Sequence, residues 1–439
     1  MALRELRVAD TGETVDNLTL SLNVLPDGSD RFNVSGPLRI TAADHTTGFD
    51  LNLSLDLSGD VPDLRLQSRS KQIHSQHFTT LAAAFANPEA TSPEPSGAAQ
   101  ETDSAEARPA SREPDAKPVW DGVLAHADLE AGRIFLPGNI QLKDLKLQAS
   151  VTEREAKLDT FSVMIDDAIA RAEGGLRFRD DHPEHPYRLH TELSFRDFNV
   201  GNFLRSVAPD EEPALEAVIS MEGAAAGESP NLGILAEFVT GEFKFSAENG
   251  TLRALRRGAV SAGAQVGGVT GRLGGMVTGR GDAEAVGQLA TYFNAIEFET
   301  LALDVRREPN FELSLTDFTL RNQDLRLQGS GKVTHMEDQP MTEHPLRLEL
   351  ALAARPPLAN LFESIHLLQE IPDERGFRSL LRPVVIQGTV AKPDARALWT
   401  IIAEAGARAA AERAVRPAER PEGENTEPAE RRRPRIPSF

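Results

Sequence analysis

The sequence contains no cysteine and few aromatic residues with a polar group, since tryptophan and tyrosine occur twice each against 20 phenylalanines. Without cysteine there is no disulfide framework, no thiolate metal site and no cysteine nucleophile. No apolar run reaches the 18 or so residues of a membrane-spanning helix. Residues 1–16 lack the apolar core of a signal peptide. The formal net charge of −20 argues against a nucleic-acid partner, because phosphates require a basic surface.

What the chain does contain is apolar residues that alternate with polar ones. In FDLNLSLDLSG, Leu51, Leu53, Leu55 and Leu57 occupy every second position, and FELSLTDFTLRNQDLRLQGSGKV near residue 320 has the same period of two. This period is typical of strands with one apolar and one polar face. Turn residues such as Asn249-Gly250, Asn322-Gln323-Asp324, Gly329 and Gly331 predict the points where strands reverse. We therefore expect a mostly β protein: an elongated, curved antiparallel sheet that forms a groove, with a few helices and disordered insertions.

Composition divides the chain into five parts. Residues 1–86 form a first β segment, and residues 87–118, rich in Pro, Ala, Ser, Glu and Asp, predict a disordered linker. The β pattern resumes at 119 and defines a core region over 119–352. Residues 353–414 predict a terminal strand and amphipathic helices, at 356–371 and 394–414. The Pro/Glu/Arg-rich residues 415–439 predict a disordered tail.

An internal repeat supports an elongated architecture. Phe161 and Gly174 match Phe318 and Gly331 at an offset of 157, and His185-Pro186 and Phe203 match His344-Pro345 and Phe362 at an offset of 159. Repeated β units need neighbours to cover their apolar faces, so they stack along one direction.

The glycine-rich segment 258–290 leaves two alternatives open. Glycines recur every four residues, at 263, 267, 271, 275 and 279. On a helix this spacing would make one flat face for close backbone contact. Glycine also disfavours a helix by roughly 1 kcal/mol per residue relative to alanine, so a flexible loop is the other interpretation.

No pattern of catalytic or metal-binding residues is evident. His74 with His77, and the group of Asp180, Asp181, His182, Glu184 and His185, lack a further ligand at a recognisable spacing. The glycines of 267–281 lack the Lys-Ser/Thr pair of a phosphate-binding loop, and no serine nucleophile motif occurs. We therefore expect a protein that is not an enzyme, with no catalytic residues, no metal and no cofactor.

Several segments, in order, resemble the C-terminal region of the AsmA-like family of bacterial envelope proteins, which is grouped with the bridge-like lipid-transfer proteins. They are GEFKFSAENGTLRAL at 241–255, Thr291-Tyr292-Phe293 before IEFETLALDV, LRLQGSGKV at 325–333, HPLRLELAL, and VVIQGTVAKPD at 384–394. The likeness covers roughly 200–400 and, more loosely, extends back to 119.

The resemblance implies a curved, open β groove whose inner face holds acyl chains. It also implies a protein of the cell envelope that faces the periplasm, is associated with the inner membrane, and partners with a phospholipid or other diacyl lipid and with the membrane surface. Family members are held by an N-terminal helix, which this sequence lacks. We therefore expect either a fragment or an inner-membrane partner protein that supplies the anchor.

Two functions remain in view. The first is non-enzymatic phospholipid binding and transfer along the groove, in support of outer-membrane lipid homeostasis; the second is a scaffold that assists outer-membrane protein assembly. The longest unbroken alternation predicts the residues that line the groove, namely Leu313, Leu315, Leu325, Leu327, Leu348 and Leu350. The alternative for these leucines is a closed core, and the two interpretations differ in whether a carboxylate at such a position can reach water.

Overall fold

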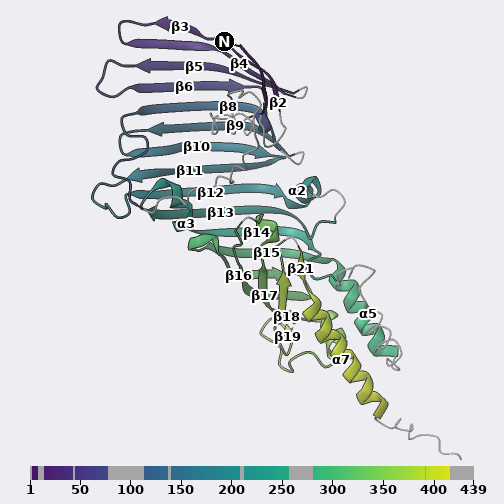
Figure 1. Cartoon of the computed structure of the whole chain (residues 1–439). Helices are drawn as coiled ribbons and strands as arrows, with labels where there is room; N and C mark the ends of the chain where they lie inside the picture. Colours follow the sequence, from purple (N-terminus) through teal and green to yellow (C-terminus); the bar gives the residue numbers. More distant parts are fainter. Residues whose placement is uncertain are drawn as a thin grey trace, which may run out of the picture.

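The structure, a computed structural model, describes residues 2–7, 14–42, 45–77, 113–136, 140–207, 212–256, 280–337, 339–390 and 392–415. Its strands belong to one long sheet in which the chain runs back and forth from the N-terminal end to the C-terminal end (Figure 1). The molecule is elongated, and its helices gather mainly at the C-terminal end of the sheet. The expectation of an elongated, mostly β protein with accessory helices is confirmed.

The elements follow in chain order. The strands are β1 (Ala2–Arg7), β2 (Thr14–Leu20), β3 (Asn23–Pro26), β4 (Arg31–Ala42), β5 (His45–Asp56), β6 (Asp63–Ser70), β7 (Ile73–His74), β8 (Leu124–Leu136), β9 (Ile140–Val151), β10 (Glu155–Ile165), β11 (Ala168–Phe178), β12 (Tyr187–Asn199), β13 (Leu215–Ser229), β14 (Thr240–Leu252), β15 (Ile296–Arg307), β16 (Leu313–Arg321), β17 (Leu325–Val333), β18 (Leu346–Ala354), β19 (Arg378–Ser379), β20 (Val384–Gly388) and β21 (Pro393–Asp394). The helices are α2 (Val200–Val207), α3 (Leu235–Phe238), α5 (Arg280–Asn294), α6 (Leu358–Ser364) and α7 (Arg396–Val415), with short 3₁₀ turns η3 (Leu232–Ile234), η4 (Pro309–Phe311) and η5 (Met341–Glu343).

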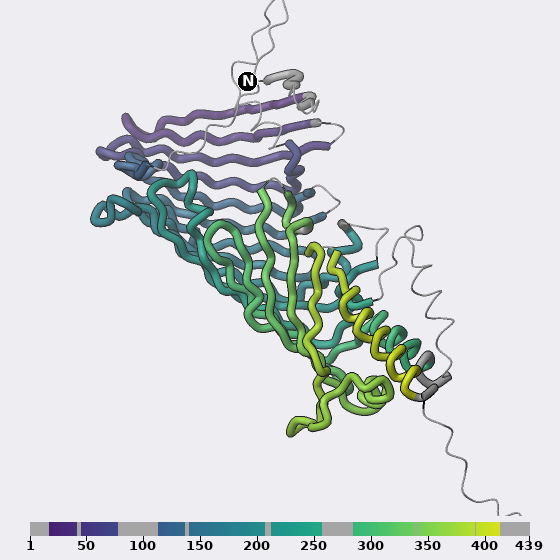
Figure 2. Tube along the Cα trace, turned by 60° about the horizontal axis from the view of Figure 1, so that its bottom comes forward, coloured from purple at the N-terminus to yellow at the C-terminus, as the bar shows by residue number. Residues whose placement is uncertain are grey.

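Sequence neighbours pair antiparallel from β8 through β18, and the sheet continues from β18 to β20 and β21. At the other end β1, β2, β4, β5 and β6 also pair antiparallel. The two series meet where β6 and β8 run parallel, with Asp63 opposite Leu124. A parallel pair requires a long return of the chain, and residues 75–123 supply it. Among the described strands β7 also runs parallel to β8, so the sheet is mixed where β6 and β7 meet β8. Strand direction turns steadily along its length (Figure 2).

Residues 113–123 lie against one end of the β11–β13 strands. The backbone N–H of Val119 donates to the Tyr187 hydroxyl at 3.1 Å, and the Asn231 side chain donates to the Glu113 carbonyl. Tyr187 is fully buried, with Trp120 and Phe178 in edge contact with its ring. Residues 113–118 of the segment expected to be a linker thus pack on the sheet, and residues 87–112 lie outside the described part.

The internal repeat is confirmed in the pairing of the strands. Phe161 faces Ala172 between β10 and β11, and Phe318 faces Gly329 between β16 and β17, at the same offset of 157. Both hairpins also carry a break in register at the same place, between residues 158 and 161 and between residues 315 and 318. Each repeat ends in a short helix after its third strand, α2 after β12 and α6 after β18.

The chain does not reverse at two of the places where the sequence predicted a turn, Asn249-Gly250 and Gly329 with Gly331. Asn249-Gly250 lies inside β14, where Asn249 takes a positive φ of 56° at a break in register with β13. Asn tolerates this left-handed conformation, so the pair forms a bulge and not a turn. Gly329 and Gly331 lie inside β17 opposite leucines of β18. Asn322 does mark a turn, because its side-chain oxygen accepts from the backbone N–H groups of Asp324 and Leu325.

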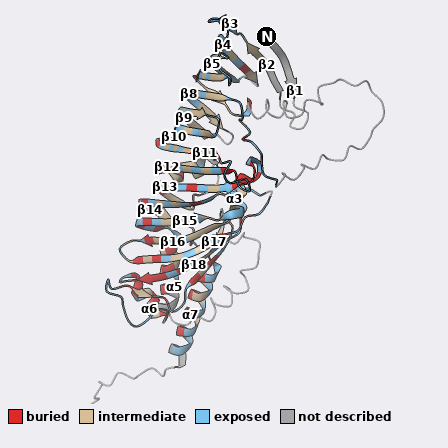
Figure 3. Ribbon diagram, turned by 90° about the vertical axis from the view of Figure 1, so that its left-hand side faces the viewer, coloured by how far each residue is buried: buried red, intermediate tan, exposed pale blue. Residues whose placement is uncertain are grey.

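The buried core lies at the C-terminal end of the sheet, under α5, α6 and α7 (Figure 3). Phe293 of α5 and Phe362 of α6 are fully buried and in ring contact, and Phe293 also contacts Trp399 of α7.

The helix expected over 356–371 is shorter, because His366 takes a positive φ of 56° just after α6. The glycine-rich segment is described only from Arg280 on, where it forms α5; residues 257–279 lie outside the described part.

Candidate functional site: the apolar face of the sheet

One row of small and apolar side chains crosses most of the sheet at a single level. Cross-strand partners point to the same side of a sheet, so the register of each pair shows which residues share a face. From β18 to β4 the row consists of Leu348, Gly331, Leu315, Val305, Phe243, Gly223, Leu193, Ala172, Phe161, Leu147, Leu129, Ser68, Leu51 and Gly36.

A second row lies two residues further along each strand, or three on β16, where the register breaks between Leu315 and Phe318. It comprises Leu350, Gly329, Phe318, Leu303, Phe245, Met221, Phe195, Ala170 and Val163, from β18 to β10. We call the surface made by the two rows the apolar face. At ~4.8 Å per strand, the first row is roughly 60 Å long over β4, β5, β6 and β8–β18.

The opposite face of the same strands is polar. Residues that flank the first row alternate to the other side and are charged or polar, such as Glu349, Lys332, Arg306, Glu242 and Lys244, all of them exposed. In contrast, every member of the first row except the buried Ser68 is half-buried. Phenylalanines and leucines that are neither buried nor fully exposed along so many adjacent strands leave a continuous apolar strip in partial contact with solvent.

Glycines keep the apolar face continuous by making room for larger neighbours. A Cβ on Gly223 would lie 2.2 Å from the ring of Phe243, and one on Gly331 would lie 2.5 Å from a methyl group of Leu348. These distances are too short for real Cβ atoms, so the phenylalanine and leucine side chains lie over the glycine backbone. The large side chains thus extend over the neighbouring strand and fill the space that the glycines leave in the row.

The six leucines predicted from sequence all lie on this side of β16, β17 and β18, but they fall into two groups. Leu325, Leu327 and Leu350 are 0%, 1% and 4% exposed and belong to the core under α5–α7. Leu313, Leu315 and Leu348 are half-buried on the part of the same face that extends beyond this core. Leu348 borders the core directly, whereas Leu315 is two strands further along the first row, on β16.

Of the two groups considered from sequence, the one at 180–185 has Asp180 paired with Arg154 at 2.9 Å and Asp181 with Arg179 at 3.5 Å. His74 stacks between His45 and Phe135, with ring centroids 4.6 Å from each, and His77 lies beside it. Burial, and then the neighbouring His45, lower the pKa of His74, which favours its neutral form. Among the residues that the structure describes, no group of three or more histidine, aspartate or glutamate side chains is arranged to hold a metal ion.

Sequence reasoning missed one group of residues at the rim of the apolar face, where β15 ends and β16 begins. We call it the Arg307 cluster, and it comprises Arg307, Phe311, His335 and His344. The guanidinium carbon of Arg307 lies 4.9 Å from the ring centre of Phe311, which contacts His335, which in turn contacts His344. The only signal was an arginine at an apolar position of the alternating run IEFETLALDVRR.

No described helix is long and apolar enough to cross a membrane. No protein-family model, curated protein or solved structure matches this chain.

Proposed function

We propose that this protein binds diacyl lipids, phospholipids in the first place, and lets them move along the apolar face between membranes of a bacterial cell envelope. The observation that carries the proposal is the first row of the apolar face, which has no charged residue from β18 to β4 and, apart from the buried Ser68, is half-buried. Soluble proteins rarely leave a continuous apolar surface of this extent uncovered unless it binds something. The resemblance to the AsmA-like proteins points to the same ligand and to a site that faces the periplasm near the inner membrane.

The shape of this surface suits a chain-like ligand. An acyl chain gains about 0.8 kcal/mol for each methylene that leaves water, so a chain of ordinary length gains roughly 10 kcal/mol. A lipid that moves from one strand to the next on a continuous row exchanges one apolar neighbour for another. Its free energy then varies little along the way, whereas a polar gap would expose methylenes and create a barrier.

The polar outer face has a complementary role in this proposal. Charged residues such as Glu242 and Lys244 alternate with Phe243 along β14, so they keep the outer surface in water while the apolar face holds the acyl chains. No bond is made or broken, and the protein acts as a surface for movement and not as an enzyme. The head group of the lipid remains in contact with water while its acyl chains lie on the apolar face.

The proposal is tested by whether the protein carries lipid. We expect the chain, when purified from bacterial cells without detergent, to contain phospholipid that mass spectrometry of an organic extract detects. We also expect it to speed the transfer of a fluorescent phospholipid between two populations of vesicles. A lipid-free preparation that does not speed transfer would contradict the proposal and favour the scaffold for outer-membrane protein assembly.

A pair of variants locates the path. Leu193 lies in the middle of the first row, on β12, and its neighbour Glu192 points to the polar face. Leu193→Asp places a charge in the row, and we expect it to lower the transfer rate at least several-fold while the protein stays folded. Glu192→Gln changes charge on the other face of the same strand, and we expect transfer at the original rate. Equal transfer by both variants would contradict movement along this row.

A further inference from the structure

The Arg307 cluster contains polar atoms that are buried but have no partner in the described structure. They are Nη1 of Arg307, Nδ1 of His335 and Nδ1 of His344. Nη2 of Arg307 donates to the carbonyl of Ala236 in α3 at 2.6 Å. Buried polar groups are nearly always hydrogen-bonded, so three without a partner in one connected cluster indicate a ligand or bound water.

The register places the cluster on the same side as the acyl-chain surface. Arg307 pairs with Leu313, and the row continues through Val333 to Leu346. The ladder extends one step further, because the N–H of Thr334 donates to the carbonyl of Pro345. The next pair would be His335 and His344. Because side chains alternate between the two faces of a strand, these two lie on the same face as Val333 and Leu346. The cluster therefore lies at the rim, where this face ends.

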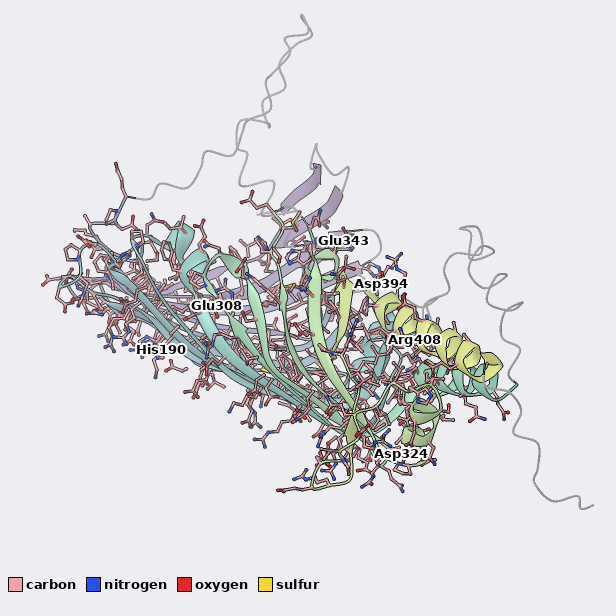
Figure 4. The ribbon with its side chains drawn as sticks, turned by 90° about the horizontal axis from the view of Figure 1, so that it is seen from below. His190, Glu308, Asp324, Glu343, Asp394 and Arg408 are labelled. Carbon is pink, nitrogen blue, oxygen red and sulfur yellow. The ribbon has the colours of Figure 1, made fainter. Side chains whose placement is uncertain are left out.

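Among the residues that the structure describes, none places a compensating charge beside the guanidinium of Arg307. No carboxylate of the described residues lies within 4 Å of it, although the neighbouring loops contain Glu308, Glu312 and Glu343. Glu312 is paired with Lys332 at 2.5 Å. Glu308 and Glu343 lie at the same end of the strands, and Asp324 lies at the opposite end (Figure 4). Burial lowers the pKa of Arg307, but an arginine keeps its proton, so the buried cation favours an anionic partner.

The histidines add two buried, unpartnered ring nitrogens to the arginine. Nε2 of His344 lies 3.1 Å from the carbonyl oxygen of Gln339, which can only accept, so this nitrogen carries the proton in the neutral ring. Nδ1 then has a free lone pair, which can accept from an O–H group of a ligand or of water. An arginine beside two imidazoles is a set of groups suited to an oxyanion such as a phosphate.

We propose that the Arg307 cluster binds the anionic phosphate-type head group of a lipid whose acyl chains lie on the apolar face. This inference rests on the proposed function and adds the class of lipid and the place of its head group. Along β15, Val305 and Leu303 lead from Arg307 onto the two apolar rows. A lipid with its phosphate at Arg307 would thus have its acyl chains beside Leu315 and Phe318. The residues of β15 on this face that lie between, Val305 and Leu303, are apolar.

A competition between two lipids tests the head-group site. The full chain is incubated with vesicles that contain phosphatidylglycerol and diacylglycerol with the same two oleoyl chains, re-isolated, and its bound lipids are quantified by mass spectrometry. We expect the wild-type protein to prefer phosphatidylglycerol. Arg307→Gln removes the cation and lowers the ratio of bound phosphatidylglycerol to diacylglycerol about tenfold, the usual effect of losing one charge-assisted hydrogen bond. Arg307→Lys keeps the charge, so we expect a smaller change.

Arg306 provides the matched control, since it is next in the chain but points to the polar face and pairs with Glu242 at 2.9 Å. We expect Arg306→Gln to leave the ratio unchanged. Because the ratio is measured on lipid bound to re-isolated folded protein, partial unfolding of a variant does not imitate the effect.

Three results would overturn the inference. The first is an equal ratio in wild type and Arg307→Gln while both bind lipid, which rejects the head-group site but leaves the apolar face as a lipid surface. The second is binding of neither lipid by the wild type, which rejects the proposed function itself. The third is binding of inorganic phosphate in an Arg307-dependent way without any preference between the lipids, which identifies a site for a free anion.

Discussion

The substitution of two leucines on neighbouring strands by glutamate distinguishes an open apolar face from a closed core. Leu327 on β17 is 1% exposed and lies between Leu320 and Leu352, both of them buried. In Leu327→Glu the loss of leucine burial costs about 2–3 kcal/mol, and an unpaired buried carboxylate costs several kcal/mol more. This sum approaches the whole stability of an ordinary domain, about 5–15 kcal/mol. We therefore expect Leu327→Glu to unfold the C-terminal end of the sheet.

Leu315 on β16 gives the opposite expectation. It is half-buried, and its cross-strand neighbours are Val305 and the glycine at 331. In Leu315→Glu about half of the leucine burial is lost, roughly 1 kcal/mol, and the carboxylate can reach water. The protein should stay folded, with bound phospholipid reduced several-fold, because a charge on the row repels acyl chains.

Guanidinium unfolding followed by circular dichroism gives the stability of each variant, and mass spectrometry of extracted lipid gives its occupancy. Gln328→Glu is the control, since Gln328 lies on β17 but is exposed on the polar face. We expect it to change neither quantity. The reasoning is refuted if Leu315→Glu unfolds as readily as Leu327→Glu, since the row would then be a core. It is also refuted if Leu315→Glu folds and retains its full lipid content.

Three further predictions concern the fold. Gly331→Ala forces a Cβ to within 2.4 Å of a backbone oxygen and should destabilise the protein by about 1–3 kcal/mol, whereas Gly287→Ala, in helix α5 with open space around it, should stabilise by about 0.5–1 kcal/mol; chemical unfolding compares them. Asn322→Ala removes the side chain that accepts from two backbone N–H groups at the β16–β17 turn. We expect this loss to lower the free energy of unfolding by ~1–3 kcal/mol, which thermal unfolding would show as a lower midpoint temperature. Burial raises the pKa of Tyr187 to about 12 and also raises that of Tyr292, the only other tyrosine, so the native protein should show little tyrosinate absorbance near pH 10. Because the unfolded chain loses these protons first, stability should fall as pH rises from about 10 towards 12; a native titration at the ordinary pKa would contradict this burial.

The alternation of apolar and polar residues made the class of fold predictable. A period of two fixes which side chains share a face, and it holds in β5 from Phe49 to Leu55 as well as in β14 around Phe243. The repeat at offset 157 was also readable, because the two hairpins keep the same register. These features depend on residues near one another in the chain, which is why sequence alone reveals them.

Features that depend on distant residues were not predictable. Gly329 was expected to reverse the chain, but its role is to leave room for Leu350 on the next strand. Half of the predicted leucines lie in a covered core because α5, α6 and α7 pack over that part of the face, and no local pattern shows where a helix will pack. The Arg307 cluster likewise brings together residues from three separate loops and strand ends.

The parallel join between β6 and β8 has a consequence for how cooperatively the molecule unfolds. Elsewhere from β8 to β18 each strand pairs with its sequence neighbour, so most contacts are local and can form hairpin by hairpin. At the join Asp63 pairs with Leu124 across the intervening segment, and closing this long loop costs more entropy than closing a short hairpin. We therefore expect β1–β7 and the strands from β8 onward to behave as two folding units that meet where β6 pairs with β8. Hydrogen exchange should show the first unit opening while the second stays protected.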